Sequence, residues 1–316
     1  MRALVTGGAG FIGHHLVRAL VDRGDDVVVL DDFSTGRRER LAGVAVSRVV
    51  EGDIRAGPEL ADALGDREVV FHLAAIASVA LSVTDPVTTN AVNVDGTVRL
   101  MVEAASAGVR RVVVASSSAV YGGDPRLPSR ETDRPDPQSP YATSKLAGEH
   151  YAHNIGAAGG VETVVLRYFN VFGPGQDPKA EYAAVVPRFI TAALAGERPI
   201  IYGDGRQSRD FTFVGDVVAA NLAAAAVPDA VGLTVNVGSG ERRSLLDLLG
   251  AVGAAAGSVL DPTFEAPRAG DVRDSQADIT LAATALGYRP SVDLAEGIGR
   301  TLASYRRPAA SASGGA

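Results

Sequence analysis

Short apolar runs alternate with longer segments of helical length along the first half of the chain. The runs are apolar at almost every position, as expected for strands of a parallel sheet that is covered on both faces. Strands that alternate with helices predict an α/β protein with a doubly wound parallel sheet. The predicted strands are residues 2–6, 26–30, 46–50, 68–75, 111–115 and 161–167.

Beyond about residue 170 the pattern loosens, and loops rich in glycine and proline interrupt helices predicted at 183–195 and 215–226. We therefore expect residues 1–170 to form mainly one domain, to which later segments return, and residues 171–305 to form mainly a smaller second lobe. Residues 306–316 are mostly small and polar, and we expect a disordered tail there.

The composition of the 316-residue chain, 46% hydrophobic and 21% charged, is typical of a globular protein with a sizeable core. Its net charge of −7 is spread along the chain, which argues against a nucleic-acid surface. The chain has no cysteine and five scattered histidines, so we expect no disulfide and no metal site. No apolar run has the length of a membrane span and no cleavable leader is visible, so we expect a cytoplasmic protein that does not bind membranes.

A glycine-rich segment directly follows the first predicted strand. Gly7, Gly10 and Gly13 differ from the spacing Gly-x-Gly-x-x-Gly by one additional residue. Gly7 allows the tight turn from strand to helix, Gly10 lets the backbone approach a pyrophosphate, and Gly13 lets the helix pack on the sheet. The order of strand, glycine loop, helix and strand predicts a Rossmann-type domain that binds a dinucleotide.

The second predicted strand ends in Asp31 and Asp32, about twenty positions after the glycines. A carboxylate there binds ribose hydroxyls and repels a 2′-phosphate, which favours NAD over NADP. Arg37 and Arg38 lie nearby and could bind a phosphate, but Asp31 outweighs them. Asp53 could meet the adenine amino group, or it could cap a turn.

The candidate chemistry lies in Tyr141 and Lys145, together with the serines at 116–118. Side chains four residues apart on a helix share one face, and an ammonium beside a phenol lowers the phenol pKa. The serines follow an apolar run, so a hydroxyl is expected at the carboxyl edge of the sheet, where ligands bind. These residues predict redox chemistry at a carbinol carbon. The alternative for Tyr141 is packing against the Lys145 stem, and His72 is interpreted as a packed strand residue.

Four motifs carry a family resemblance: Thr-Gly-Gly-Ala-Gly-Phe-Ile-Gly at 6–13, Ser-Ser-Ser-Ala-Val-Tyr-Gly at 116–122, Ser-Pro-Tyr-Ala-Thr-Ser-Lys at 139–145 and Arg-Tyr-Phe-Asn-Val-Phe-Gly-Pro at 167–174. Together they resemble the extended short-chain dehydrogenase/reductases of the NAD-dependent epimerase/dehydratase family. Within that family the chain is most similar to UDP-glucose and UDP-N-acetylglucosamine 4-epimerases. The likeness extends to about residue 305 and implies tightly bound NAD, with a nucleotide sugar in the second lobe.

The resemblance implies a role for each catalytic candidate. Tyr141 would take the proton of the sugar 4-hydroxyl while C4 passes a hydride to NAD, and the 4-keto sugar would then turn over and take the hydride back on its other face. Lys145 would lower the Tyr141 pKa and hold the nicotinamide ribose, and Ser117 matches the family's catalytic serine or threonine. The implied cofactor-binding residues are Gly7, Gly10, Phe11, Ile12, Gly13, Asp31, Asp32, Ser34, Thr35, Gly36, Asp53, Ile54, Leu73, Ala74, Ala75, Ala77, Asn93, Ser116, Tyr141, Lys145, Tyr168 and Val171.

The resemblance also bears on the substrate. Dehydratases of the family have an Asp-Glu pair after the catalytic serine or threonine, whereas this chain has Ser118 and Ala119, which argues against dehydration. Ser275 falls at a size-gating position and leaves room for a 2-acetamido group. Uronic-acid epimerases tend to have an arginine near residues 175–177, which is absent here. The implied substrate-binding residues are Ser117, Ser118, Tyr141, Asn170, Val185, Tyr202, Arg209, Arg268, Asp271 and Ser275.

Three alternatives remain: a UDP-glucuronate 4-epimerase, a nucleotide-4-ketosugar reductase, and an NAD-sensing or scaffold protein without activity. A reductase would consume added NADH or NADPH, whereas an epimerase would need none. Members of the family usually form dimers by packing two helices from each subunit into a four-helix bundle. Here these would be residues 87–107 and the helix of Tyr141, so we expect a homodimer.

Overall fold

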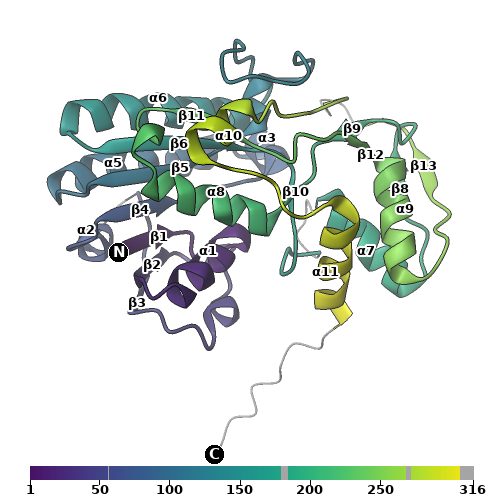
Figure 1. Ribbon diagram of the computed structural model, residues 1–316, viewed down its shortest axis with the longest axis horizontal. Helices are drawn as coiled ribbons and strands as arrows, with labels where there is room; N and C mark the ends of the chain where they lie inside the picture. The colour runs from purple at the N-terminus through teal and green to yellow at the C-terminus, as the bar shows by residue number, and fades with distance from the viewer. Residues whose placement is uncertain (56, 179–183, 268–271, 307–316) are drawn as a thin grey trace, which may run out of the picture.

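The computed structural model describes residues 1–55, 57–178, 184–267 and 272–306. Arg268, Asp271 and residues 307–316 of the predicted tail 306–316 lie outside the described residues, whereas Arg306 ends a helix. The described residues form two lobes, one around a large sheet and a smaller one that contains α7 (Val185–Ala195), α9 (Leu245–Ala256) and α11 (Leu294–Arg306), as Figure 1 shows.

A seven-stranded sheet with only parallel neighbours forms the centre of the larger lobe, in the order β3-β2-β1-β4-β5-β6-β11. This order confirms the doubly wound fold and has its switch point between β1 and β4. β11 is the one strand of this sheet that we did not predict, and it returns from beyond the second-lobe segments to pair with β6. The strands are β1 (Arg2–Thr6), β2 (Asp26–Asp31), β3 (Arg48–Glu51), β4 (Val69–His72), β5 (Arg111–Ser117), β6 (Glu162–Tyr168) and β11 (Thr234–Val237).

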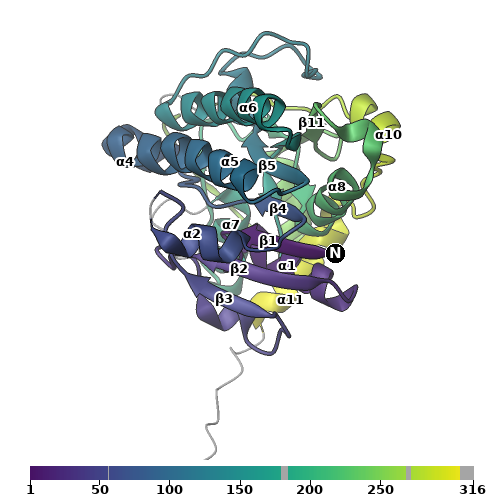
Figure 2. The same cartoon turned by 90° about the vertical axis from the view of Figure 1, so that its left-hand side faces the viewer.

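Helices cover both faces of this sheet, so both faces of its strands are apolar (Figure 2). One face packs against α2 (Pro58–Leu64), α5 (Gly96–Ser106) and α6 (Pro140–Gly159). The other packs against α1 (Phe11–Asp22) and α8 (Val214–Ala226), with α10 (Thr280–Leu286) beside α8 and β11. No helix of the described residues combines the length and apolar character needed to cross a membrane.

The predicted helix at 87–107 is divided into three parts. α4 (Pro86–Asn90) is followed by a π-helical turn, η2 (Ala91–Asp95), and only then by α5. Asn93 lies inside that turn. Its side-chain oxygen accepts a hydrogen bond from the Ile76 amide, and its side-chain nitrogen donates to the Ile76 carbonyl and to the Ser144 hydroxyl. These long-range bonds accompany the wider turn, and π-turns of this kind often occur at functional sites. A short helix, α3 (Val79–Thr84), precedes α4.

The smaller lobe has its own apolar core, in which Phe172, Phe189 and Phe213 pack against leucines of α9 and α11. Its strands form short two-stranded pairs. These are β7 (Val171–Phe172) with β10 (Thr212–Phe213), β8 (Ile200–Tyr202) with β13 (Thr263–Glu265), and β9 (Ser208–Arg209) with β12 (Arg243–Ser244). The 3₁₀ helices of the described residues are η1 (Arg38–Leu41), η3 (Ser118–Tyr121) and η4 (Pro228–Ala230).

Candidate active site

The start of α6 is fixed by its own sequence. Ser139 caps the first turn by accepting a 3.1 Å hydrogen bond from the amide of Ala142, and Pro140 occupies the first helical position, where no amide is needed. The helix therefore presents Tyr141 and Lys145 from consecutive turns at the carboxyl edge of the sheet.

The structure brings together the three predicted catalytic side chains. The Tyr141 hydroxyl shares a hydrogen bond with the hydroxyl of Ser117, the last residue of β5. The Lys145 ammonium donates a 2.9 Å hydrogen bond to the carbonyl of Ala115, two residues earlier on the same strand. Ser117 and the two helical residues thus form one constellation.

Burial controls the ionisation of this constellation. Burial raises the pKa of Tyr141, and the hydrogen bond with Ser117 acts in the opposite direction without cancelling it. Burial also lowers the pKa of Lys145 to about 8, although the charge of Glu149 opposes this shift. Burial and the Ser117 hydrogen bond account for the shift in the Tyr141 pKa, so its lowering by Lys145 stays a prediction.

The glycine loop fits a dinucleotide. Gly7 has a φ of +69°, and a Cβ there would lie 2.8 Å from the amide nitrogen of Ala74, so the loop and the segment after β4 are in close contact. A Cβ on Gly13 would lie 2.1 Å from the Gly7 carbonyl oxygen, so no other residue fits at that crossing. α1 begins at Phe11 with no side-chain cap in the described structure, which leaves its first amides available for a phosphate.

The carboxylate of Asp31 holds the loops that would surround an adenosine. It is 6% exposed and accepts hydrogen bonds from the amides of Ala9 (2.8 Å) and Phe33 (2.9 Å). Burial raises its pKa, and these two bonds oppose the shift. Asp32 is exposed and instead caps its own turn at Ser34. Asp31 is thus the acid that contacts the glycine loop.

The other charged candidates near this loop are engaged with neighbours. Arg37 pairs with Asp177, and Arg38 pairs with Glu51 and lies over the ring of Phe33.

Asp53 accepts a 2.8 Å hydrogen bond from the amide of Arg55, which matches its interpretation as a turn cap. His72 is buried between Thr6 and Thr97, at 2.9 Å from each hydroxyl, as expected for a packed strand residue.

Two predicted cofactor contacts have side chains that point into the interior. The Ser116 hydroxyl donates to Glu149, and the Tyr168 hydroxyl donates to Asn221 at 3.0 Å. Any cofactor contact of these residues would use their backbones. The remaining candidates lie at the start of α1 (Phe11, Ile12), after β2 (Ser34, Thr35, Gly36), after β3 (Ile54, buried in the core), after β4 (Leu73, Ala74, Ala75, Ala77), in η2 (Asn93) and in β7 (Val171).

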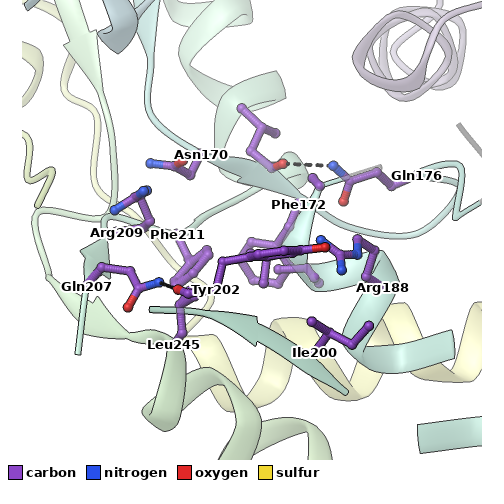
Figure 3. A pocket seen from close by; sticks show the side chains of 14 residues that line it. Asn170, Phe172, Gln176, Arg188, Ile200, Tyr202, Gln207, Arg209, Phe211 and Leu245 are labelled. Carbon is purple, nitrogen blue, oxygen red and sulfur yellow. Dashed lines mark hydrogen bonds between the residues drawn. The ribbon is translucent and has the colours of Figure 1, made fainter. Parts of the chain in front are cut away.

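A cavity of about 270 Å³ opens in the smaller lobe (Figure 3). Four predicted substrate contacts, Asn170, Val185, Tyr202 and Arg209, line it. Asn170 lies two residues beyond Tyr168, the register partner of Ser117, so the cavity begins beside the catalytic constellation although it does not include it. Ser118 directly follows Ser117, and Arg268 and Asp271 lie outside the described residues.

The cavity wall also contains polar residues that we did not predict. Gln176 and Gln207 each have a buried side-chain oxygen without a hydrogen-bond partner in the described structure, and Arg188 lies over the Tyr202 ring. A buried oxygen without a partner is costly, so both positions fit a ligand that donates hydrogen bonds. No sequence motif marks these three side chains, because they meet only through the fold.

The rest of the site contains the predicted size gate. Ser275 is 8% exposed and its hydroxyl accepts a 3.1 Å hydrogen bond from the Asn170 side chain. Asn170 therefore joins the cavity, the gate and the end of β6. Among the described residues, no group of three or more histidine or acidic side chains could hold a metal ion.

A parallel sheet with a glycine loop at its switch point, and with serine, tyrosine and lysine at the neighbouring strand ends, defines a nicotinamide-dinucleotide-dependent enzyme. The chain belongs to the NAD-dependent epimerase/dehydratase family, whose model matches residues 3–238. This match confirms the resemblance drawn from the four motifs, and with it NAD as the cofactor.

Similar proteins in the family include several UDP-sugar 4-epimerases and also UDP-sugar decarboxylases. A UDP-glucose 4-epimerase of Mycolicibacterium smegmatis is 45% identical, over 97% of this chain and 99% of that protein. The structure of the Thermotoga maritima UDP-glucose 4-epimerase with UDP-glucose is 38% identical, covers 97% of this chain and 99% of its own, and has a TM-score of 0.92. A UDP-N-acetylglucosamine 4-epimerase of Methanobrevibacter ruminantium M1, in complex with UDP-N-acetylmuramic acid, is 37% identical, covers 96% of this chain and 97% of its own, and has the same TM-score of 0.92.

Proposed function

We propose that this protein is an isomerase that inverts C4 of a UDP-hexose through a transient 4-keto sugar. The observation that carries the proposal is the constellation of Ser117, Tyr141 and Lys145 beside the glycine loop. Full-length similarity to UDP-sugar 4-epimerases supports it. The neutral pair Ser118 and Ala119, where a dehydratase needs an acid and a base, argues for epimerisation within this family.

The chain's own residues would move one proton and hold two ligands. Tyr141 removes the proton of the sugar 4-hydroxyl, and the Ser117 hydroxyl stabilises the same oxygen as its bond order changes. Lys145 supplies a positive charge one helical turn away. When bound, NAD would supply a reversible hydride acceptor for C4. Because the hydride returns to the same molecule, the reaction is redox-neutral and requires no further cofactor.

The two ligands would divide between the lobes. We assign NAD to the larger lobe of residues 1–170 with its returning segments, where the glycine loop and Asp31 fit a pyrophosphate and a ribose. We assign the nucleotide of the sugar to the lobe of residues 171–305. The unpaired oxygens of Gln176 and Gln207 and the guanidinium of Arg209 suit the polar and anionic groups of UDP.

Ser275 would decide which hexose is accepted. A serine at the gate leaves space for a 2-acetamido group, so we propose UDP-N-acetylglucosamine and UDP-N-acetylgalactosamine as substrates beside UDP-glucose and UDP-galactose. UDP-glucuronate is the alternative substrate. It is less favoured because residues 175–177 include no arginine that could bind the carboxylate of the sugar. A 4-ketosugar reductase would use the same catalytic residues.

The active unit would be a homodimer. Six large apolar side chains are exposed on the mutually packed helices α3 to α6, and the most exposed of them is Val87, at 78%. A groove between α4 and α6 lies on the same side of the molecule. A second copy packing its α5 and α6 here would bury this surface, in line with the expected four-helix bundle. The exposed side chains are Val79, Leu81, Val83, Val87, Val102 and Tyr151.

Turnover of separate UDP-sugars without added NAD tests the proposal. Purified protein is incubated with UDP-glucose, UDP-N-acetylglucosamine or UDP-glucuronate, and the products are separated by chromatography. A C4 epimer from any substrate, with NAD released on denaturation and with loss of turnover in Tyr141→Phe, supports an epimerase and ranks the sugars. Conversion only of a ketosugar with added NADH or NADPH would replace the epimerase by a reductase.

A further inference from the structure

A buried ion pair lies directly behind the catalytic constellation. Glu149 and Arg167 are 3% and 5% exposed, and two hydrogen bonds of 2.9 and 2.7 Å join the guanidinium to the carboxylate. Glu149 follows Lys145 by one turn of α6, so Tyr141, Lys145 and Glu149 occupy one helix face. Isolated buried ion pairs are weak sources of stability, so this pair calls for another explanation.

The pair contacts the strand end that carries the chemistry. The Ser116 hydroxyl donates to Glu149, and Ser116 is the register partner of Arg167 across β5 and β6. Ser116 lies between the two residues that hold the catalytic side chains: the Ala115 carbonyl accepts from Lys145, and Ser117 bonds Tyr141. Fixing Ser116 therefore fixes both contacts at once.

The network continues beyond the pair and keeps Arg167 in place. Arg167 also donates a 3.0 Å hydrogen bond to the Tyr121 hydroxyl, which donates in turn to Asn236 on β11 at 2.7 Å. Burial lowers the pKa of Arg167, but the hydrogen bonds and charge of Glu149 outweigh burial and raise it overall. Arg167 is thus a permanent cation that holds the carboxylate against α6 and β5.

We infer that Glu149, held by Arg167, is a positioning residue for the reaction: it sets the charge on Lys145 and fixes the end of β5 through Ser116. The inference rests on the proposed function only for its effect on turnover. Glu149, on the same helix, acts on the Lys145 ammonium beside Tyr141, and the ammonium in turn acts on His72 of β4. His72 is neutral at working pH because burial lowers its pKa to about 3, so Glu149 is the anion that favours the ammonium.

The chain contains two lysines, Lys145 and Lys179, which makes the charge on Lys145 directly measurable. Protein labelled with carbon-13 lysine in a Lys179→Arg background gives one lysine signal, whose chemical shift is followed against pH. Replacement of Glu149 by glutamine is expected to lower the pKa of Lys145 by about one unit, because an opposite charge is removed from its side.

A second ion pair on the same two strands provides a matched control. Arg111 and Glu162 are register partners at the other end of β5 and β6, and Arg111 bonds Glu162 at 2.8 Å. Glu162→Gln also breaks an arginine–glutamate bridge and is expected to leave the Lys145 titration unchanged. Equal Lys145 pKa values in the Glu149→Gln and Glu162→Gln variants would overturn the inference.

Ser116→Ala isolates the positional half of the inference. It removes the hydroxyl that joins Glu149 to β5 and leaves the ion pair intact, so it remains informative where Glu149→Gln does not fold. Loss of alignment at the strand end is expected to lower kcat about 10- to 100-fold with little change in KM. A wild-type kcat in Ser116→Ala would overturn this half. If the Lys145 pKa shifts in Glu149→Gln but the protein epimerises no UDP-sugar, the proposed function is contradicted and the role of Glu149 beside Lys145 is not.

Discussion

The Nζ of Lys145 donates a 2.9 Å hydrogen bond to the carbonyl oxygen of Ala115. This bond attaches the catalytic helix to the strand that ends in Ser117, so the lysine is oriented by the backbone rather than by the phenol of Tyr141. The Lys145 ammonium is therefore held one helical turn from Tyr141 by a hydrogen bond that does not involve the tyrosine hydroxyl.

Removal of this charge is expected to stop turnover while leaving the fold intact. Lys145→Met keeps most of the buried stem and removes the ammonium. We expect kcat to fall by about 10²- to 10⁴-fold, the usual contribution of a group that assists proton transfer. Steady-state turnover of UDP-glucose measures the effect, with circular dichroism as the control for folding. A loss of less than about threefold would exclude a catalytic role for Lys145.

The glycine loop predicts a sharp contrast between two helical glycines. Gly13→Ala would place a Cβ 2.1 Å from the Gly7 carbonyl, whereas Gly250→Ala on α9 meets nothing within 4 Å. We expect the first variant to lose bound NAD and several degrees of Tm, and the second to gain about 0.5–1 kcal/mol of stability from helix propensity. Differential scanning fluorimetry and the NAD content of purified protein provide both readouts. Equal Tm values in the two variants would contradict the close contact between Gly13 and the Gly7 carbonyl oxygen.

The size gate predicts a change in specificity. Ser275→Tyr would fill the space beside Asn170 and is expected to lower kcat/KM for UDP-N-acetylglucosamine by about 100-fold, with much less effect on UDP-glucose. Ser275→Ala is the matched control, since it keeps the space and removes only the hydroxyl. Parallel loss of both activities in Ser275→Tyr would show that this residue supports the fold rather than selects the sugar.

The buried His14 predicts acid sensitivity. Burial, and next the neighbouring His15, lower the pKa of His14 from 6.5 to about 4. Between these two pKa values the unfolded chain binds more protons than the folded chain. The contribution of His14 to the free energy of unfolding is therefore complete above pH 6.5 and is lost as pH falls through about 4. The loss amounts to about 3 kcal/mol at pH 4. Urea unfolding should have a smaller pH slope in this window for His14→Gln. His150→Gln, at an exposed position, is the control variant.

The exposed apolar side predicts the oligomeric state. Val87→Asp would place a carboxylate on the side that we assign to the dimer interface, and burial of an unpaired charge there is unfavourable. Light scattering coupled to size exclusion is expected to give a dimer for wild type and a monomer for Val87→Asp. Val259→Asp, at a fully exposed residue of the other lobe, is the control and should remain dimeric. A monomeric wild type would remove the proposed interface.

The features that sequence predicted well depend on short separations along the chain. A turn with positive φ at Gly7, the acid that ends β2 and the spacing of Tyr141 and Lys145 follow from local geometry. The features that were missed depend on distant contacts. Asn93 bonds Ser144 across 51 positions and lies in a π-turn that no local pattern marks. Likewise, the depth of burial that raises the Tyr141 pKa is a property of the folded molecule.

The return of β11 to the large sheet has a consequence for how the chain can fold during synthesis. β6 has β5 on one side, and its other edge is covered only by β11, which ends at Val237. Until the ribosome has released that segment, β6 presents a row of unpaired backbone groups of the kind that recruits foreign strands. A fragment that stops near residue 170 would keep this open edge permanently. The sheet of the larger lobe therefore cannot be completed until the chain has passed through the smaller lobe and reached β11.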